Sequence, residues 1–104
     1  MKTANEIQPT ALFHPGIVLN EEISYRGLMK KEVADKIGIS PSVLSEIISG
    51  KRSITPRIAI RLEDALDINA LFFLNMQSRY DYYTLKGKLR KLSQYKKVKG
   101  KSAA

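Results

Sequence analysis

Two short amphipathic segments joined at a glycine constrain the fold of this chain more than any other feature of its sequence. The first, residues 30–37, places three apolar side chains on one stripe of a helix, namely those of Val33, Ala34 and Ile37. Gly38 follows where a left-handed residue would end that helix, a conformation that is nearly free only for glycine. Ser40 is a typical N-cap residue and Pro41 suits the first helical position, so a second helix is expected to begin there.

The spacing of residues across this hinge predicts a helix-turn-helix unit. Counted from Lys30, Ala34 is the fifth residue, Gly38 the ninth and Leu44 the fifteenth. A small fifth residue lets the two helices approach closely, glycine makes the sharp turn, and a branched apolar residue packs underneath. In such units the second helix enters the major groove of DNA. An ordinary helical hairpin is the alternative interpretation.

Three further helices are expected, so the predicted fold class is all-α with five helices. The tripeptide HPG at 14–16 precedes a helix at 17–26, and a Thr-Pro pair at 55–56 starts another at 57–66. Asn69 caps a fifth helix, in which large side chains recur at three- and four-residue steps. This spacing favours core or dimer packing for the aromatic residues over a cofactor site or a base-stacking platform. The inward residues expected on the last two helices are Ile58, Ala59, Leu62, Leu66, Phe72, Phe73, Met76, Tyr80 and Tyr83.

Charge divides the chain into one domain and a tail. Residues 1–84 contain ten Lys or Arg and ten Asp or Glu, whereas residues 85–104 contain eight Lys or Arg and no acid. The whole excess of +8 therefore lies in the last part of the chain. We expect an N-terminal extension at 1–13, a helix-turn-helix domain at 14–84 and a basic C-terminal tail at 85–104.

The basic tail is expected to be partly helical or disordered. Leu85, Leu89 and Leu92 continue a helical spacing into it, although Gly87 weakens the helix, and disorder is expected beyond Lys96. A basic tail can add non-specific affinity for DNA through counterion release. Because it acts on any polyanion, it cannot supply sequence preference.

Several functional classes are excluded or disfavoured by composition. The absence of cysteine removes disulfides, thiolate zinc sites and cysteine nucleophiles. His14 is the only histidine, so a structural role at a helix entry is expected of it rather than metal binding. No nucleophile–base arrangement and no phosphate-cradling glycine loop is present, so we expect neither an enzyme nor a cofactor. Without an apolar spanning segment or a signal-peptide pattern, the expected location is the cytoplasm.

The chain from about His14 to Tyr82 resembles the HigA family, the antitoxin branch of the Xre/Cro-like (lambda-repressor-like) helix-turn-helix regulators. The resemblance implies a homodimer that binds double-stranded operator DNA, represses its own operon and neutralises a RelE/HigB-like, mRNA-cleaving toxin. The last of the matching stretches is the most discriminating. These stretches are HPG at 14–16, EE at 21–22, SEIISGKRSIT at 45–55, AIRLEDAL at 59–66 and FFLNMQSRYD at 72–81.

The chain departs from the family pattern in two places, and the first departure lowers the expected strength of base recognition. The family often opens the second helix of the unit with arginine or other long polar residues, where this chain has Pro41, Ser42 and Val43. The first helix usually begins with a serine cap and glutamine, where this chain has Met29 and Lys30. The second departure replaces a neutral phosphate contact with a charged one.

Four residues near the start of the second helix are candidates for contact with bases: Ser42, Val43, Ser45 and Glu46. A serine can bond several bases or a phosphate, so it carries little sequence information. Val43 could pack against a thymine methyl group, and Glu46 could accept a hydrogen bond from a cytosine amine. Alternatively, Glu46 orients Lys51 or Arg52.

Five residues are candidates for contact with phosphates: Lys30, Lys31, Ser40, Lys51 and Arg52. Two lysines at a helix start oppose the helix dipole by a few tenths of a kcal/mol each, which a phosphate partner would offset. The pair just after Gly50 is well placed for the DNA backbone. Solvated side chains are the alternative in both places.

Two other functions stay open at this point. The chain could be a stand-alone Xre-type transcriptional regulator without a toxin. It could also be mainly a protein-binding inhibitor whose affinity for DNA comes from the basic tail alone.

Overall fold

Five α-helices make up the described part of the chain, which the computed structural model covers from residue 12 to residue 103, with side chains to residue 92. No strand occurs within that part. The helices are α1 Pro15–Tyr25, α2 Lys30–Lys36, α3 Pro41–Ile48, α4 Pro56–Leu66 and α5 Ala70–Ala103. All five expected helices are thus confirmed. The predicted N-terminal extension falls almost wholly outside the described residues.

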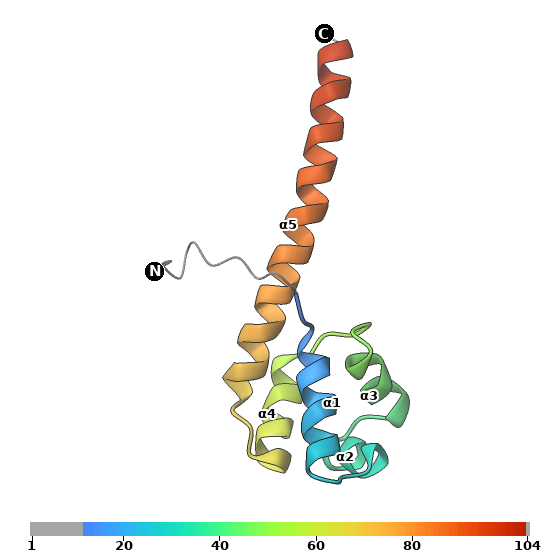
Figure 1. Ribbon diagram of the computed structural model, residues 1–104, viewed down its shortest axis with the longest axis vertical. Helices are drawn as coiled ribbons and strands as arrows, with labels where there is room; N and C mark the ends of the chain where they lie inside the picture. Colours follow the sequence, from blue (N-terminus) through green and yellow to red (C-terminus); the bar gives the residue numbers. More distant parts are fainter. Residues whose placement is uncertain (1–11, 104) are drawn as a thin grey trace.

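The first four helices and the start of α5 form a compact head (Figure 1). Within it, α1 packs against α3 and α5, α2 packs against α3 and α4, and α4 packs along α5. Helix α5 then runs on beyond the head as a single projecting rod. None of the described helices is both long enough and apolar enough to cross a bilayer.

Three helices begin with the same device, a polar cap followed by proline. In each case the cap side chain accepts a hydrogen bond from a backbone N–H of the first turn, which would otherwise lack a partner. Proline at the first position costs nothing, because its missing N–H is one of the unsatisfied groups. The pairs are His14 with Gly16 at 2.9 Å, Ser40 with Val43 at 3.1 Å and Thr55 with Ile58 at 3.3 Å.

Helix α5 is capped from two sides. The side-chain oxygen of Asn69 accepts from the backbone N–H of Leu71 at 2.8 Å, which confirms the predicted cap. The Glu63 carboxylate, from α4, accepts from the N–H of Ala70 at 2.8 Å. Helix α5 is therefore tied at its first turn to the helix that it packs against.

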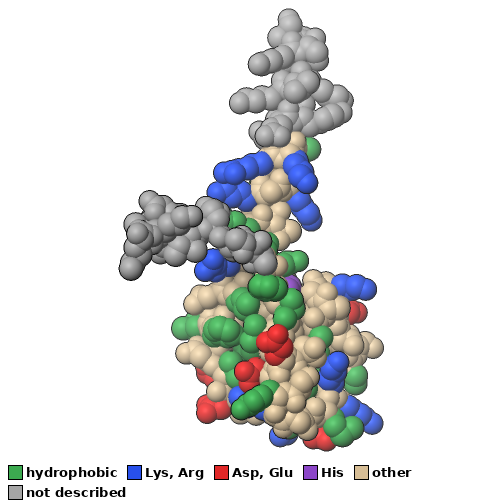
Figure 2. Space-filling model, viewed as in Figure 1, with side chains coloured by type: hydrophobic (Ala, Val, Ile, Leu, Met, Phe, Trp, Pro, Cys, Tyr) green, Lys and Arg blue, Asp and Glu red, His purple; other side chains and the backbone are tan. Residues whose placement is uncertain are grey.

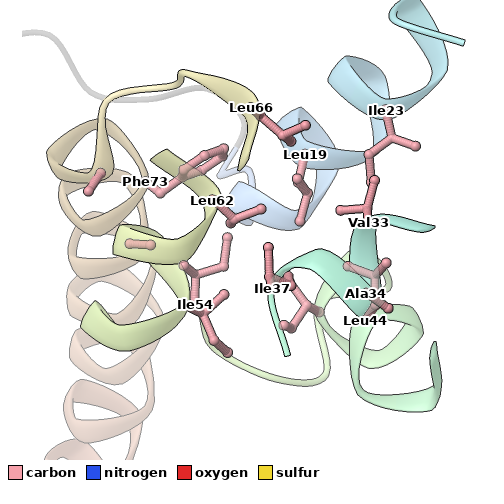
Figure 3. Packing of buried hydrophobic residues seen from close by; sticks show 14 residues of the cluster. Leu19, Ile23, Val33, Ala34, Ile37, Leu44, Ile54, Leu62, Leu66 and Phe73 are labelled. Atoms are coloured by element: carbon pink, nitrogen blue, oxygen red, sulfur yellow. The ribbon is translucent and has the colours of Figure 1, made fainter. Parts of the chain in front are cut away.

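The core of the head draws on all five helices and on the loop between α3 and α4 (Figure 3). Every inward residue predicted on α4 is buried, as are the hinge residues Ala34 and Leu44. Phe73 of α5 is completely buried. The buried hydrophobic cluster comprises Leu19, Ile23, Val33, Ala34, Ile37, Leu44, Ile47, Ile54, Ile58, Ala59, Leu62, Leu66, Ala70 and Phe73.

The aromatic residues of α5, for which core or dimer packing was expected, lie only partly in the core. Phe73 lies in the core, but Phe72 is 47% exposed and Tyr82 is 54% exposed. Neighbouring residues on a helix point about 100° apart, so Phe72 and Phe73 cannot both face the core. Phe72 instead lines an open groove with Phe13, Met76 and other residues at the entry to α1.

Helix α5 also extends further than the sequence suggested. We expected disorder beyond Lys96, but the structure continues the helix through Gly87 to Ala103. The segment is rich in Leu, Lys and Arg, which are good helix formers, and it contains no proline. The boundary placed at residue 84 lies inside this one helix.

Candidate nucleic-acid interface

The hinge between α2 and α3 has the geometry of a helix-turn-helix unit. Gly38 has φ +71°, in the left-handed region, as its position predicts. The backbone N–H of Gly38 donates to Asp35 at 3.2 Å, and that of Ile39 donates to Ala34 at 3.0 Å. These bonds satisfy carbonyls at the end of α2 and turn the chain sharply into α3.

Arg61 of α4 closes the same hinge from the outside. Its guanidinium donates to the carbonyl of Ile37 at 3.0 Å. A Cβ atom at Gly38 would lie 2.3 Å from that guanidinium nitrogen. The bare glycine thus serves both the left-handed turn and the approach of Arg61, which sequence spacing alone did not reveal.

Replacing Gly38 with alanine is expected to lower the free energy of unfolding by about 2 kcal/mol, as measured by urea denaturation. About 1 kcal/mol is the cost of a side chain in the left-handed conformation, and losing the Arg61 contact adds about as much again. Gly27→Ala is the matched control, because Gly27 has φ +66° but has nothing within 4 Å of its added Cβ. Equal losses in the two variants would show that Arg61 adds nothing to the hinge.

Helix α3 turns its candidate base-reading residues in different directions. Ser42 and Ser45 are exposed, on the side away from the buried Leu44. Val43 is half-buried and packs against the core. Only part of its side chain is therefore open to a thymine methyl group.

Glu46 is occupied by Arg52. One carboxylate oxygen of Glu46 accepts from the Arg52 Nε at 2.8 Å and lies 2.8 Å from a second guanidinium nitrogen. Both side chains are partly exposed, so such a pair contributes at most about 1 kcal/mol to stability. In this geometry Glu46 orients Arg52, which was the alternative interpretation of that residue.

The candidate phosphate-binding residues lie on both sides of α3 along the chain. Lys30 and Lys31 are exposed at the start of α2, where Met29 makes no side-chain cap. Lys51 and Arg52 are exposed just after α3. Figure 2 shows Lys and Arg side chains on the side of the head where α3 lies. The hydroxyl oxygen of Ser40 accepts the hydrogen bond that caps α3, and its hydroxyl proton can still donate to a phosphate.

A buried polar junction anchors the loop that carries Lys51 and Arg52. Gln77 of α5 is 5% exposed, and its side-chain oxygen accepts from the backbone N–H of Ile54 at 2.8 Å. Its amide nitrogen donates to Asp81 at 2.9 Å. Nearby, the His14 ring meets the Tyr80 ring edge-on, with centroids 5.0 Å apart. Gln77 lies in the FFLNMQSRYD run, which the sequence analysis identified as a family-specific stretch without assigning a role to Gln77.

His14 serves the helix entry, as its sequence position suggested. It is 5% exposed, and burial lowers its pKa from the usual 6.5, while the Asp81 carboxylate and a hydrogen bond to the backbone of Arg52 act in the opposite direction. Its Nδ1 must be unprotonated to accept from Gly16. Within the described part of the chain, no group of three or more His, Cys, Asp or Glu side chains could hold a metal ion.

This lowered pKa predicts that the head loses stability as the pH falls below about 6.5. The unfolded chain then takes up a proton at His14 that the folded chain resists, so the loss begins at the unfolded value and continues down to the folded one. His14→Asn keeps a cap acceptor but cannot titrate. Thermal unfolding from pH 7.5 to 5.5 should show a steeper fall for the parent chain than for this variant. Parallel curves would exclude His14 as the source.

Comparisons with known proteins find a family model and related sequences that match this chain. A family model described as helix-turn-helix, HTH_3, matches residues 26–73. Virulence-associated protein A of Dichelobacter nodosus is 39% identical over 71 residues, which is 64% of this chain and 68% of that protein. Virulence-associated protein A' of the same organism is 33% identical over 69 residues, 65% of this chain but only 60% of that protein, so the match spans less than two thirds of its length.

Two solved structures share the fold at greater coverage. An addiction module antidote protein of a HigA family from Coxiella burnetii is 30% identical, with 82% of this chain and 95% of that chain covered and a TM-score of 0.70. The Pseudomonas aeruginosa antitoxin HigA, solved with the higBA promoter, is 27% identical, with 82% and 94% covered and a TM-score of 0.73.

Proposed function

This chain belongs to the Xre-like helix-turn-helix family HTH_3, and we propose that it is a sequence-specific DNA-binding antitoxin. Its structural neighbours are HigA-family antitoxins of plasmid maintenance and addiction systems. In this proposal the protein represses its own operon and neutralises a RelE/HigB-like, mRNA-cleaving toxin.

The observation that carries the DNA-binding part is the outer face of the hinge. Ser42 and Ser45 stand exposed at the start of α3, and pairs of exposed cations precede and follow them along the chain at 30–31 and 51–52. Serine hydroxyls can bond base edges, and Lys and Arg can hold the phosphates on either side of the groove. The same arrangement in an ordinary helical hairpin would have no evident purpose.

In this proposal the protein binds DNA as a homodimer. Two copies would place two α3 helices in successive major grooves, roughly 34 Å apart along the duplex. With two short hydroxyls and part of Val43 at the base edges, and with Glu46 held by Arg52, direct readout is modest. Specificity would then depend partly on the shape and deformability of the operator.

Removing the projecting part of α5 after Tyr83 is expected to leave the preference for the operator over random DNA intact. Tyr83 lies beyond the anchoring residues Phe73 and Gln77, so the head keeps its core and its polar junction. The plot of log affinity against log salt should become shallower, by about 0.9 for each phosphate contact that the removed cations made. Electrophoretic mobility shifts at several salt concentrations, with an operator selected from random DNA, measure both quantities.

The same truncation separates this proposal from the inhibitor alternative. If binding and preference both vanish while the truncated chain stays folded by circular dichroism, the basic tail and not the hinge carries recognition.

The toxin is tested separately from the DNA. A short reading frame for a basic protein beside this gene should encode a product that co-purifies with the chain and whose mRNA cleavage the chain suppresses. The stand-alone regulator is favoured instead if operator binding is found but no neighbouring product associates.

A further inference from the structure

A line of exposed apolar side chains runs along the projecting part of α5. It consists of Tyr82, Leu85, Leu89 and Leu92, which we call the α5 seam. These side chains are 54%, 56%, 54% and 49% exposed, respectively. Their spacing of three, four and three residues is that of the a and d positions of a coiled coil. The seam belongs to neither the hinge nor the core of the head.

Basic side chains flank the α5 seam. Lys86 lies against Tyr82, with its amine 3.0 Å from the phenol oxygen and 5.1 Å from the ring centroid. Lys88, Arg90 and Lys91 are exposed around it, and the sequence contains no acid from residue 85 onward. Figure 2 shows Lys and Arg side chains on both sides of the projecting helix. The surface therefore combines a narrow apolar line with a strongly positive surround.

The width of the α5 seam points to a helix rather than a lipid surface. At about 100° per residue, its four side chains span about 80° of the helix circumference. A helix that lies on a membrane, or on a broad protein core, needs an apolar face wider than about 100°. A strict a and d line of this kind is covered by one partner helix.

A second copy of the chain fits this seam poorly in an antiparallel pair. Antiparallel pairing that sets Tyr82 on Leu92 and Leu85 on Leu89 also brings Lys86 opposite Lys86 and Lys88 opposite Lys88. Like charges at these flanking positions are destabilising.

We propose that the α5 seam is a docking site for an acidic amphipathic helix of a partner protein. The apolar a and d residues of that helix would cover the four seam side chains. Its Asp or Glu residues at the flanking positions would face Lys86 and Lys88, where a like-charged helix is repelled. The site is separate from the DNA-reading face, so both can be occupied together.

A designed peptide of about four heptads tests the chemistry directly. One version has Leu at the a and d positions and Glu at the e and g positions, and the matched version has Lys in place of Glu. Isothermal titration of the full chain should show binding of the acidic version and at least tenfold weaker binding of the basic one. Raising the salt concentration should weaken the acidic complex.

Three variants locate the peptide on the α5 seam. Leu85→Asp with Leu89→Asp should weaken binding by at least a hundredfold, because two anchoring side chains lose their apolar contact. Leu71→Asp is the matched control, since Leu71 is exposed on α5 outside the seam, and it should bind as the parent does. Gly87→Ala should tighten binding by up to about fivefold, because it stiffens the helix before it binds. A Cβ there meets nothing within 4 Å.

Three results would overturn the proposal. Equal binding of the two peptides would show that the basic surround plays no part. Binding to phosphatidylglycerol vesicles without binding to the acidic peptide would make the seam a lipid surface. Sedimentation that shows self-association, abolished by Leu85→Asp with Leu89→Asp, would assign the seam to a second copy. Operator binding by the same variants reports on the head separately, so failure here leaves the DNA-binding proposal standing.

Discussion

Replacing Gly16 with alanine is expected to lower the free energy of unfolding by about 3 kcal/mol or more, a large share of the total stability of a domain this size. A Cβ atom at this position would lie 1.9 Å from the carbonyl oxygen of Ile47 and 2.8 Å from its carbonyl carbon. Both atoms belong to the backbone of α3, so no side chain can move aside. The start of α1 would have to shift away from the helix that it packs against.

The variant is best measured by urea denaturation monitored by circular dichroism. Gly87→Ala is the control, because Gly87 also lies in a helix but has nothing within 4 Å of an added Cβ. That change should leave global stability unchanged or slightly raised. If the free energy of unfolding of Gly16→Ala lies within about 0.5 kcal/mol of that of the parent chain, α1 and α3 do not pack as closely as in the structure.

The second large effect is expected at the DNA. Changing Lys30, Lys31, Lys51 and Arg52 together to alanine should weaken binding at 0.15 M salt by a factor on the order of 10²–10³. Each phosphate contact contributes about fivefold at that salt concentration, since affinity varies with salt to the power of about −0.9 per contact. The loss should be the same for the operator and for random DNA, because phosphates carry no sequence.

Two comparisons make this result specific. Lys36→Ala removes an exposed cation from the far end of α2 and should change affinity little. Ser42→Ala with Ser45→Ala should narrow the gap between operator and random DNA while leaving the salt slope as it was. A fourfold-substituted chain that loses only its preference for the operator would assign these cations to base contact instead.

The hinge could be predicted because its constraints are local. A left-handed turn requires glycine, a helix start favours Ser-Pro or Thr-Pro, and a buried face repeats every three or four residues, so spacing along the chain reports directly on these features. The caps at Ser40, Thr55 and Asn69 and the turn at Gly38 were all identified from the sequence in this way.

What the sequence did not reveal depends on contacts between distant residues. Gln77 binds the backbone of Ile54, Arg61 binds the backbone of Ile37, and a guanidinium from Arg26 binds the carbonyl of Leu66. These side chains bind backbone groups. Every residue has the same backbone groups, so the sequence at the accepting or donating position gives no sign of the contact. The direction of Phe72 escaped prediction for a related reason, since it depends on which helices pack against α5. The length of α5 instead follows from local propensity, because Leu, Lys and Arg favour the helix beyond Lys96.

Helix α3 carries buried residues on one face and exposed residues on another, and this separation affects how such a protein can evolve. Leu44 and Ile47 hold the helix in place, whereas Ser42 and Ser45 touch no part of the core. If the two serines contact bases as proposed, substitutions there would alter the preferred operator without endangering the fold. In the proposed complex, a duplicated gene could shift its target partly through these two positions, because short hydroxyls leave room for larger side chains there.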